Sequence, residues 1–314
     1  LINKIAEEFK GHLHGRKRRD TPLPDDAKGI HPDEITDEEF SKVRHLPYAS
    51  LLCSIGYVAE WSKPELLFAR SLLSSNLRRW NSELWGWLLD AAIYMIGHKA
   101  FGTIWSMGMD AHGPNVLYGF ADASFGGEPK GRSRCARVVK FNGAAILCKT
   151  NKSTIVHMST TASEIDAGNQ TGLDIVAIRN LLEELGVWYT NPTVIYEDNQ
   201  ATIQIANNEA ALGDANRHMH RRLFKIKELV ENKTVLLAFM ETQRQVADIL
   251  TKALGRIAFC RLRDDLTGYT TVNAPGSNIH LNADELKDRL TTMNKKCTST
   301  TTKECTNSTT TCAK

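Results

Sequence analysis

The chain has 314 residues, of which 42% are hydrophobic and 24% charged, and its formal net charge is +3. These fractions are those of a soluble globular protein, and the length suggests about two domains. No apolar run is long enough to span a membrane, and the N-terminus lacks the pattern of a secretory signal. So small a net charge says little about nucleic-acid binding, because such binding requires a local basic surface.

The sequence contains seven cysteines, and none of them forms a C-x-x-C pair or a cluster with histidine. A zinc site is therefore not expected. We expect free thiols and a reducing compartment, cytosolic or nuclear, and we do not expect secretion.

The first third of the chain is predicted to be mainly helical. A polar stretch at 15–35, rich in proline and charge, is typical of a loop. Apolar residues then recur at three- and four-residue steps over 36–110, apart from a short strand-like stretch at 101–105. Because no cluster of acids, histidines or cysteines suggests catalysis here, we interpret this part as a helical packing module.

Beyond a break with Gly and Pro at 111–115, predicted strands alternate with predicted helices. Strands are predicted at 116–125, 133–141, 144–150, 193–198 and 234–241, and helices at 159–186, 201–208, 220–232 and 244–254. Asn142-Gly143 is a strong hairpin signal between the second and third strands. The order β-β-β-α-β-α-α-β-α predicts an α/β fold with a mixed five-stranded sheet flanked by helices.

Four carboxylates occupy positions in this order from which they could meet. Asp122 lies within the first strand among apolar residues, Glu164 in the first turn of the long helix, Asp198 at the end of the fourth strand, and Asp248 in the last predicted helix. We expect no basic partner at matching positions, so the acids would repel one another unless divalent ions neutralised them. Oxygen-only ligands favour Mg²⁺, or else Mn²⁺, and two such ions about 4 Å apart would support phosphodiester cleavage.

Each acid also has a simpler interpretation. Glu164 could complete a capping box with Thr161, Asp198 could cap the following helix, and Asp248 could lie on a solvated helix face. Taken one at a time these interpretations are favoured, but the joint pattern reverses the preference.

The neighbours Glu197 and Asp198 are predicted to differ in role. Alternation along the strand places Asp198 on the face of Val194 and Tyr196, and Glu197 on the opposite face, toward solvent or a helix. We therefore expect Asp198, and not Glu197, to be the metal ligand.

Several segments resemble the C-terminal part of the Pol polyprotein of copia-type LTR retrotransposons. YGFADASFGG (118–127) is similar to that family's Y-x-D-A-D-x-A-G, STTASEI (159–165) to S-S-T-E-A-E-Y, RHMHRR (217–222) to K-H-I-D-x-R, and ADILTKAL (247–254) to A-D-x-L-T-K-x-L. Asp198-Asn199 matches D-N-x-x-A loosely. The similarity covers about 113–265 well and extends more weakly upstream over 47–69.

The resemblance implies three regions: the end of the polymerase region with a helical connection (1–112), a ribonuclease H-like domain (113–265) and a disordered Thr-rich tail (266–314). It implies metal-dependent hydrolysis of the RNA strand of RNA–DNA hybrids, with Asp122, Glu164, Asp198 and Asp248 as catalytic metal ligands. The implied partners are the hybrid and the upstream polymerase region, in a cytoplasmic virus-like particle or the nucleus. The Y-x-D-D motif of the polymerase is absent, so polymerisation is not expected.

Some positions depart from the family pattern. Ala162 replaces the first Glu of the helix motif, His220 the Asp of K-H-I-D, Ala215 an Arg, and Cys53 a linker Gly. One alternative is therefore a catalytically decayed or domesticated remnant that still binds nucleic acid. Another is an integrase-type DDE nuclease on the same fold, which the acid order and the last predicted helix disfavour.

Basic side chains crowd the helix predicted at 220–232 and the residues before it, where they could hold the phosphates of a duplex. The candidate nucleic-acid contacts are Arg217, His218, Arg221, Arg222 and Lys225, with Ser124 and Asn199 added because they adjoin acids. A solvated basic face is the competing interpretation. The sequence does not predict the oligomeric state.

Overall fold

A computed structural model describes residues 1–105, 116–207 and 220–269, with the backbone alone for 220–224. All of these residues belong to one compact unit, Leu1–Thr271. The predicted boundary near 112 and all but the first four residues of the predicted tail (266–314) lie outside the described residues, so both stay predictions.

The N-terminal region is helical, as its periodicity indicates. Its helices are α1 (Ile2–Glu8), α2 (Lys10–Leu13), α3 (Asp37–Val43), α4 (Tyr48–Trp61), α5 (Leu67–Ser74) and α6 (Ser82–Gly97). Thr36 caps α3 through a capping box, and the Asn81 side chain caps α6. The strand predicted at 101–105 does not form, because the Ile104 N–H donates to the Thr267 carbonyl, which belongs to no strand.

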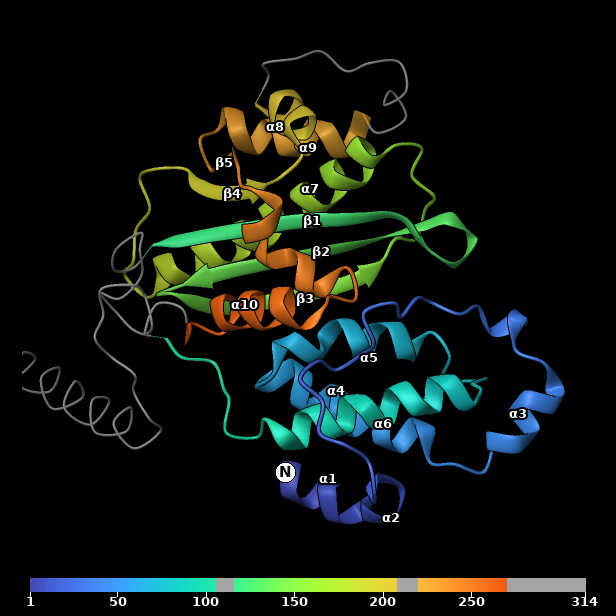
Figure 1. Ribbon diagram of the computed structural model, residues 1–314. Coiled ribbons are helices and arrows are strands. Elements are labelled where there is room, and N and C mark those ends of the chain that lie inside the picture. The colour runs from blue at the N-terminus through green and yellow to red at the C-terminus, as the bar shows by residue number, and fades with distance from the viewer. Residues whose placement is uncertain (106–115, 208–219, 270–314) are drawn as a thin grey trace, which may run out of the picture. The chain divides into compact units, whose positions relative to one another are not determined.

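The predicted mixed sheet is confirmed (Figure 1). Its strands are β1 (Leu117–Glu128), β2 (Arg132–Phe141), β3 (Ala144–Lys152), β4 (Thr193–Glu197) and β5 (Val235–Phe239), in the order β3-β2-β1-β4-β5. The first three strands pair antiparallel, whereas β1, β4 and β5 are parallel. Asn142 and Gly143 both have positive φ, 51° and 84°, as the tight β2–β3 turn requires.

Helices cover both faces of this sheet. The helices α7 (Thr160–Glu184), α8 (Gln200–Ala206) and α9 (His220–Glu231) lie on one face, and α10 (Arg256–Leu266) on the other, with the N-terminal helices (Figure 1). Alternate residues of β1 serve the two cores, since Leu117 and Ala121 pack with the α7 side and Tyr118 and Phe120 with the N-terminal helices. Helix α7 approaches β1 closely at Gly119, where a Cβ atom would lie 2.9 Å from Thr171 Cγ2.

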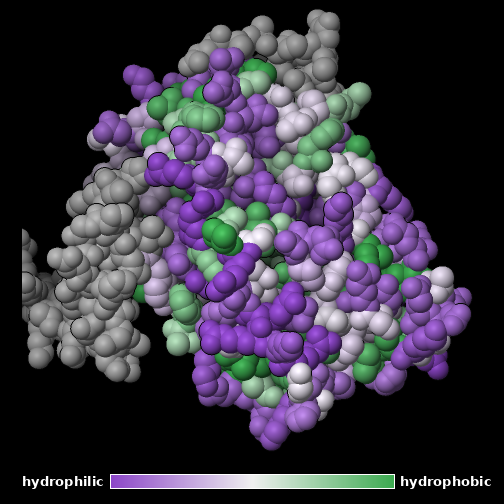
Figure 2. Space-filling model, viewed as in Figure 1, coloured by the Kyte–Doolittle hydropathy of each residue, from purple (hydrophilic) through white to green (hydrophobic). Residues whose placement is uncertain are grey.

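Large apolar side chains are concentrated in these two cores. Tyr57 and Trp61 are exceptions, neighbouring rings on α4 that are both exposed. On the face drawn in Figure 2, hydrophilic side chains predominate and apolar ones form small separate groups. Among the described helices, none has the length and apolar character needed to cross a bilayer.

The last predicted helix, 244–254, is wrong in form. The chain instead makes two short 3₁₀ turns, Thr242–Arg244 and Val246–Leu250, and the terminal helix α10 begins only at Arg256. The difference arises because side chains of this segment, Thr242, Gln245 and Thr251, form hydrogen bonds to the end of the sheet. In a 3₁₀ turn residues three apart eclipse each other, so Asp248 and Thr251 share one side.

A buried ion pair joins the N-terminal helices to the sheet. Arg134 on β2 is fully buried, and its guanidinium donates to Glu128 Oε1 (2.6 Å) and to Ser71 Oγ on α5 (2.5 Å). It also lies over the Phe68 ring, 5.3 Å from the centroid. The guanidinium therefore links three separate segments at once.

Substitution Arg134→Met should lower the free energy of unfolding by about 3–5 kcal/mol, because it leaves the buried Glu128 carboxylate without its main partner. The matched control is Arg256→Met, which removes an exposed pair with Asp20 (2.7 Å, arginine side chain 74% exposed) and should cost less than about 1 kcal/mol. Urea unfolding monitored by circular dichroism measures both. Equal losses for the two variants would contradict the assignment of Arg134 as a buried tie.

Candidate active site

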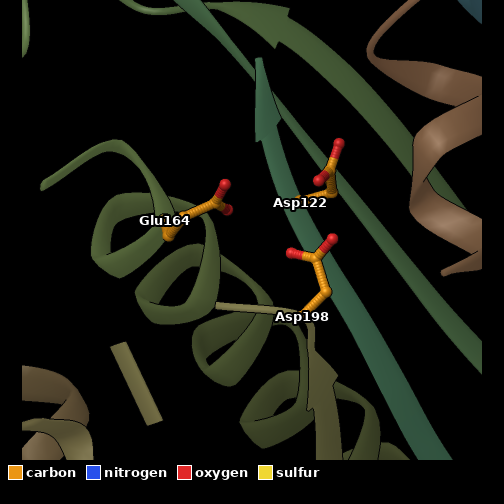
Figure 3. A group of neighbouring side chains, drawn as sticks. All are labelled: Asp122, Glu164 and Asp198. Carbon is orange, nitrogen blue, oxygen red and sulfur yellow. The ribbon is translucent and has the colours of Figure 1, made fainter. Parts of the chain in front are cut away.

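Three acids from separate elements converge at one end of the sheet. Asp122 on β1, Glu164 on α7 and Asp198 after β4 each offer a carboxylate oxygen, and these oxygens lie within 4.8 Å of one another (Figure 3). The strand register explains why Asp122 and Asp198 meet. Phe120 on β1 lies opposite Tyr196 on the parallel strand β4, and each aspartate follows two residues later in its own segment. The pairing of β1 with β4 thus places both aspartates side by side.

Asp248 approaches the same cluster from the 3₁₀ turn. Its side chain is only 6% exposed, and its carboxylate is the charge that, after burial, does most to raise the pKa of Asp122. The structure therefore brings all four predicted acids to one place, although the tight group of oxygens comprises Asp122, Glu164 and Asp198.

Burial and mutual repulsion raise the pKa values of these acids. The pKa of Asp122 rises to about 7, first through burial and then through Asp248. Burial, followed by repulsion from Glu197 and Asp122, raises the pKa of Glu164 well above its usual value. Burial also raises the pKa of Asp248, against the opposing effect of Lys252. Such crowding is stable only if protons or cations neutralise the site.

The segment 242–252 holds the acids in position. The Thr251 hydroxyl donates to Asp122 Oδ2 (2.5 Å), and the Thr242 hydroxyl donates to Asp198 Oδ2 (2.8 Å). One oxygen of each aspartate is thereby oriented by a threonine. Neither threonine was predicted from the sequence, where the only signal was the proximity of both to Asp248 in the chain.

Gln245 fixes the separation of the two strands that carry the aspartates. It is fully buried, and its Nε2 donates to the carbonyls of Ala121 on β1 (2.9 Å) and Tyr196 on β4 (3.3 Å). These carbonyls lie where the ladder between β1 and β4 ends. The amide therefore bridges the strands just below Asp122 and Asp198.

The expectation that no basic residue accompanies the acids is wrong. Lys252 Nζ lies 2.9 Å from Asp248 Oδ1, and its ammonium is attracted by Asp122 and Asp198 as well, which raises its pKa despite partial burial. The four-residue spacing from Asp248 within ADILTK was the available signal.

Glu197 does not face solvent. It is fully buried on the face of Ile195 that packs toward α7, so of the two predicted environments the helix-facing one is confirmed. Its Oε1 accepts from the N–H groups of Asp198 (3.1 Å) and Asn199 (3.2 Å). Burial first, and then the charge of Asp122, raises its pKa well above the usual value. Glu197 thus holds the turn that carries Asp198.

The simpler interpretations of the acids do not hold in the structure. The cap of α7 is Ser159, whose Oγ accepts from Ala162 N–H (3.1 Å), so Glu164 completes no capping box. The cap of α8 is Asn199 and not Asp198. Asp248 is buried and therefore not on a solvated face.

The predicted nucleic-acid contacts are only partly described. Asn199 is occupied as the α8 cap, through a bond to the Thr202 N–H (3.1 Å), and Ser124 lines a cavity of about 390 Å³ beside the cluster. Lys225 pairs with Glu228 on α9 (3.1 Å). Arg217 and His218 lie outside the described residues, as do the side chains of Arg221 and Arg222.

Relatives of the chain are Pol polyproteins of retrotransposons. It is 26% identical over 262 residues to the Retrovirus-related Pol polyprotein from transposon TNT 1-94 of Nicotiana tabacum, covering 82% of this chain and 19% of that protein. It is 22% identical over 223 residues to the Transposon Ty1-LR3 Gag-Pol polyprotein of Saccharomyces cerevisiae, covering 70% of this chain and 12% of that one. The resemblance stated from the motifs is thus confirmed, and the chain spans less than a fifth of the length of these relatives. No family model matches.

Solved ribonuclease H structures are similar only loosely. LC11-RNase H1 in complex with RNA/DNA hybrid has a TM-score of 0.36 at 11% identity, covering 44% of this chain and 96% of that chain. RNase H1 from Halobacterium salinarum NRC-1 has a TM-score of 0.33 at 14% identity, covering 46% and 98%. The fold class therefore depends on the strand order, the pairing directions and the flanking helices described above.

Without added divalent ions, the free energy of unfolding should fall as pH rises from about 4 to about 7. The folded state keeps the Asp122 proton up to its raised pKa of about 7, whereas the unfolded state loses it near 4, so each pH unit costs at most about 1.4 kcal/mol for this group. Asp122→Asn should reduce the slope, of which Glu164, Glu197 and Asp248 retain a part through their own raised pKa values. Asp37→Asn, on an aspartate whose side chain is 96% exposed, should leave the slope unchanged. Urea unfolding across this pH range decides, and equal slopes in wild type and Asp122→Asn would contradict the raised pKa.

Proposed function

We propose that this chain is the ribonuclease H part of a retrotransposon Pol polyprotein and hydrolyses the RNA strand of RNA–DNA hybrids. The observation that supports this proposal best is the convergence of Asp122, Glu164 and Asp198, within 4.8 Å, at one end of a mixed sheet. The similarity to retrotransposon Pol polyproteins supports a nuclease in the same position. Substrate and mechanism follow from the resemblance and the chemistry of the acids.

The acids fit a pair of divalent cations. Glu164 is buried and its Oε2 has no hydrogen-bond partner, as expected of an oxygen that serves as a metal ligand. The donors are all carboxylate oxygens, which suit Mg²⁺ or Mn²⁺ better than zinc. Asp122, Glu164, Asp198 and Asp248 would hold the ions, which supply an activated water and stabilisation of the leaving oxygen when bound.

The chain's own residues supply order to this site. The Thr251 and Thr242 hydroxyls orient Asp122 and Asp198, so one oxygen of each aspartate is fixed before any ligand arrives. Gln245 holds the strand separation, and Glu197 holds the turn before α8. Such pre-organisation lowers the cost of assembling a crowded anionic site.

The RNA–DNA hybrid and the upstream polymerase region are the partners that we propose. The hybrid would lie over the acid cluster, with its phosphates held by the basic residues Arg217, His218, Arg221, Arg222 and Lys225. We propose that Ser124 contributes from β1, where it lines the cavity beside the cluster, whereas Asn199 caps helix α8. We also propose a location in a cytoplasmic virus-like particle or the nucleus.

Incubation with labelled duplexes and Mg²⁺ tests this function. Cleavage of the RNA strand in an RNA–DNA hybrid, without cleavage of double-stranded DNA, is the expected result. Binding of the hybrid without cleavage would indicate a decayed remnant. The departures from the family pattern at Ala162, Ala215 and His220 favour that alternative. Nicking or joining of DNA would select an integrase-type nuclease.

Substitution Asp198→Asn should reduce Mg²⁺-dependent cleavage by more than about a hundredfold, because it removes a charged metal ligand while keeping shape. Glu164→Gln should behave alike, and Glu184→Gln, an exposed glutamate on the same helix α7, is its matched control. Single-turnover cleavage of a labelled hybrid measures the rates, and circular dichroism checks folding. A fully active Asp198→Asn protein would refute the assignment.

A further inference from the structure

Lys252 lies at the boundary between the acid cluster and the cavity beside it. Its ammonium pairs with Asp248 Oδ1 at 2.9 Å, while its side chain remains 44% exposed. It also lines the cavity of about 390 Å³, together with Ser124, Gly126, Gly127 and Thr251. The ammonium therefore pairs with the buried Asp248, while the same side chain borders the cavity.

This ion pair differs from a structural salt bridge in its surroundings. Arg134 is fully enclosed and shares its guanidinium among several fixed partners, whereas Lys252 pairs with Asp248 and has an open flank. A single lysine cannot neutralise four acids, but it lowers the net negative charge of the cluster by one and so weakens the repulsion among the carboxylates. The ammonium thus neutralises part of the charge that divalent ions would neutralise in full.

A divalent ion and the ammonium compete for the same carboxylate. A bound ion would lie about 2.1 Å from its oxygen ligands, whereas Lys252 Nζ is 2.9 Å from Asp248 Oδ1. Two cations of total charge +3 so close together repel strongly at a partly buried site. Because the lysine stem is flexible and its flank is open, the ammonium can move outward while Asp248 cannot.

We propose that Lys252 is the internal counter-ion of the acid cluster, that divalent ions displace it, and that the displaced ammonium then binds a phosphodiester group in the cavity. The second step rests on the proposed function, because it requires a nucleic acid at this site. The ion exchange does not, since it concerns only the acids, the lysine and the metal.

The cavity favours Lys252 as its phosphate contact. Asp25 and Asp26 line the other wall, with Lys28 beside them, so that wall carries an acidic excess. Lys252 and Ser124 line the cavity together with Thr251, whose hydroxyl donates to Asp122 of the acid cluster. Release from Asp248 would give this wall an unpaired positive charge where the anion lies.

The ion exchange is tested by titrating metal-free protein with Mn²⁺ alone and following free Mn²⁺ by electron paramagnetic resonance. Lys252→Met should bind Mn²⁺ about fivefold more tightly, because no ammonium has to be displaced, and should unfold at a lower urea concentration in EDTA. Lys252→Arg keeps the charge and should behave like wild type. Lys252→Gln serves as a second neutral variant if the Met protein folds poorly.

Two controls separate displacement from general electrostatics. Lys149→Met removes a lysine with a similar partner distance, 3.0 Å to Asp174, and similar exposure, 48%, and should leave Mn²⁺ affinity unchanged. In an Asp248→Asn background, Lys252→Met should no longer tighten Mn²⁺ binding. Unchanged Mn²⁺ affinity in Lys252→Met, or an equal gain in the Asp248→Asn background, would overturn the proposal.

The phosphate contact is tested with a 2′-O-methyl RNA–DNA hybrid, which keeps the phosphates but has no free 2′-OH to support cleavage. With Mn²⁺ present, Lys252→Met should reduce the slope of log affinity against log salt by roughly one, and in EDTA it should not. An unchanged slope with Mn²⁺ would overturn this step. Because the Mn²⁺ titration needs no substrate, it still decides the ion exchange if no hybrid is cleaved.

Discussion

The dominant constraint on this structure is the burial of several carboxylates at one end of the sheet. Asp122, Glu164, Glu197 and Asp248 are all nearly inaccessible, and each has its pKa raised by desolvation. Ordinary packing would favour apolar residues at such positions, because burying unpaired charge is costly. At this end of the sheet the fold accepts that cost, and the hydrogen bonds around the cluster serve to contain it.

Containment comes from one short segment. Within 242–252, two threonines, a glutamine and a lysine bond to the acids or to the strands that carry them. The segment is therefore shaped by its side chains and forms 3₁₀ turns where periodicity predicts a helix. A regular helix would spread these four side chains around its axis, and the cluster would lose its support.

The sequence predicted the sheet, the order of the helices as far as α9 and the four acids, because alternation and helical periodicity are local properties of the chain. It did not predict Gln245, Thr242 or Thr251, whose roles depend on contacts between segments more than forty residues apart. Glu197 also shows that a local pattern does not predict contacts between distant segments. Alternation assigned it correctly to the face opposite Tyr196, but only packing of α7 on the sheet decides that this face is dry.

The core shared by the N-terminal helices and the sheet has a consequence for how such a chain evolves. Tyr118, Phe120 and Val138 on the sheet pack in one core with residues such as Leu72 and Leu88 of the helices. If residues 116–269 were exchanged between two diverged sequences of this kind, the helices and the sheet would contribute core residues that had not evolved together. Recombination that keeps the helices and the sheet together should be tolerated far more often, so that the two regions are inherited as one block.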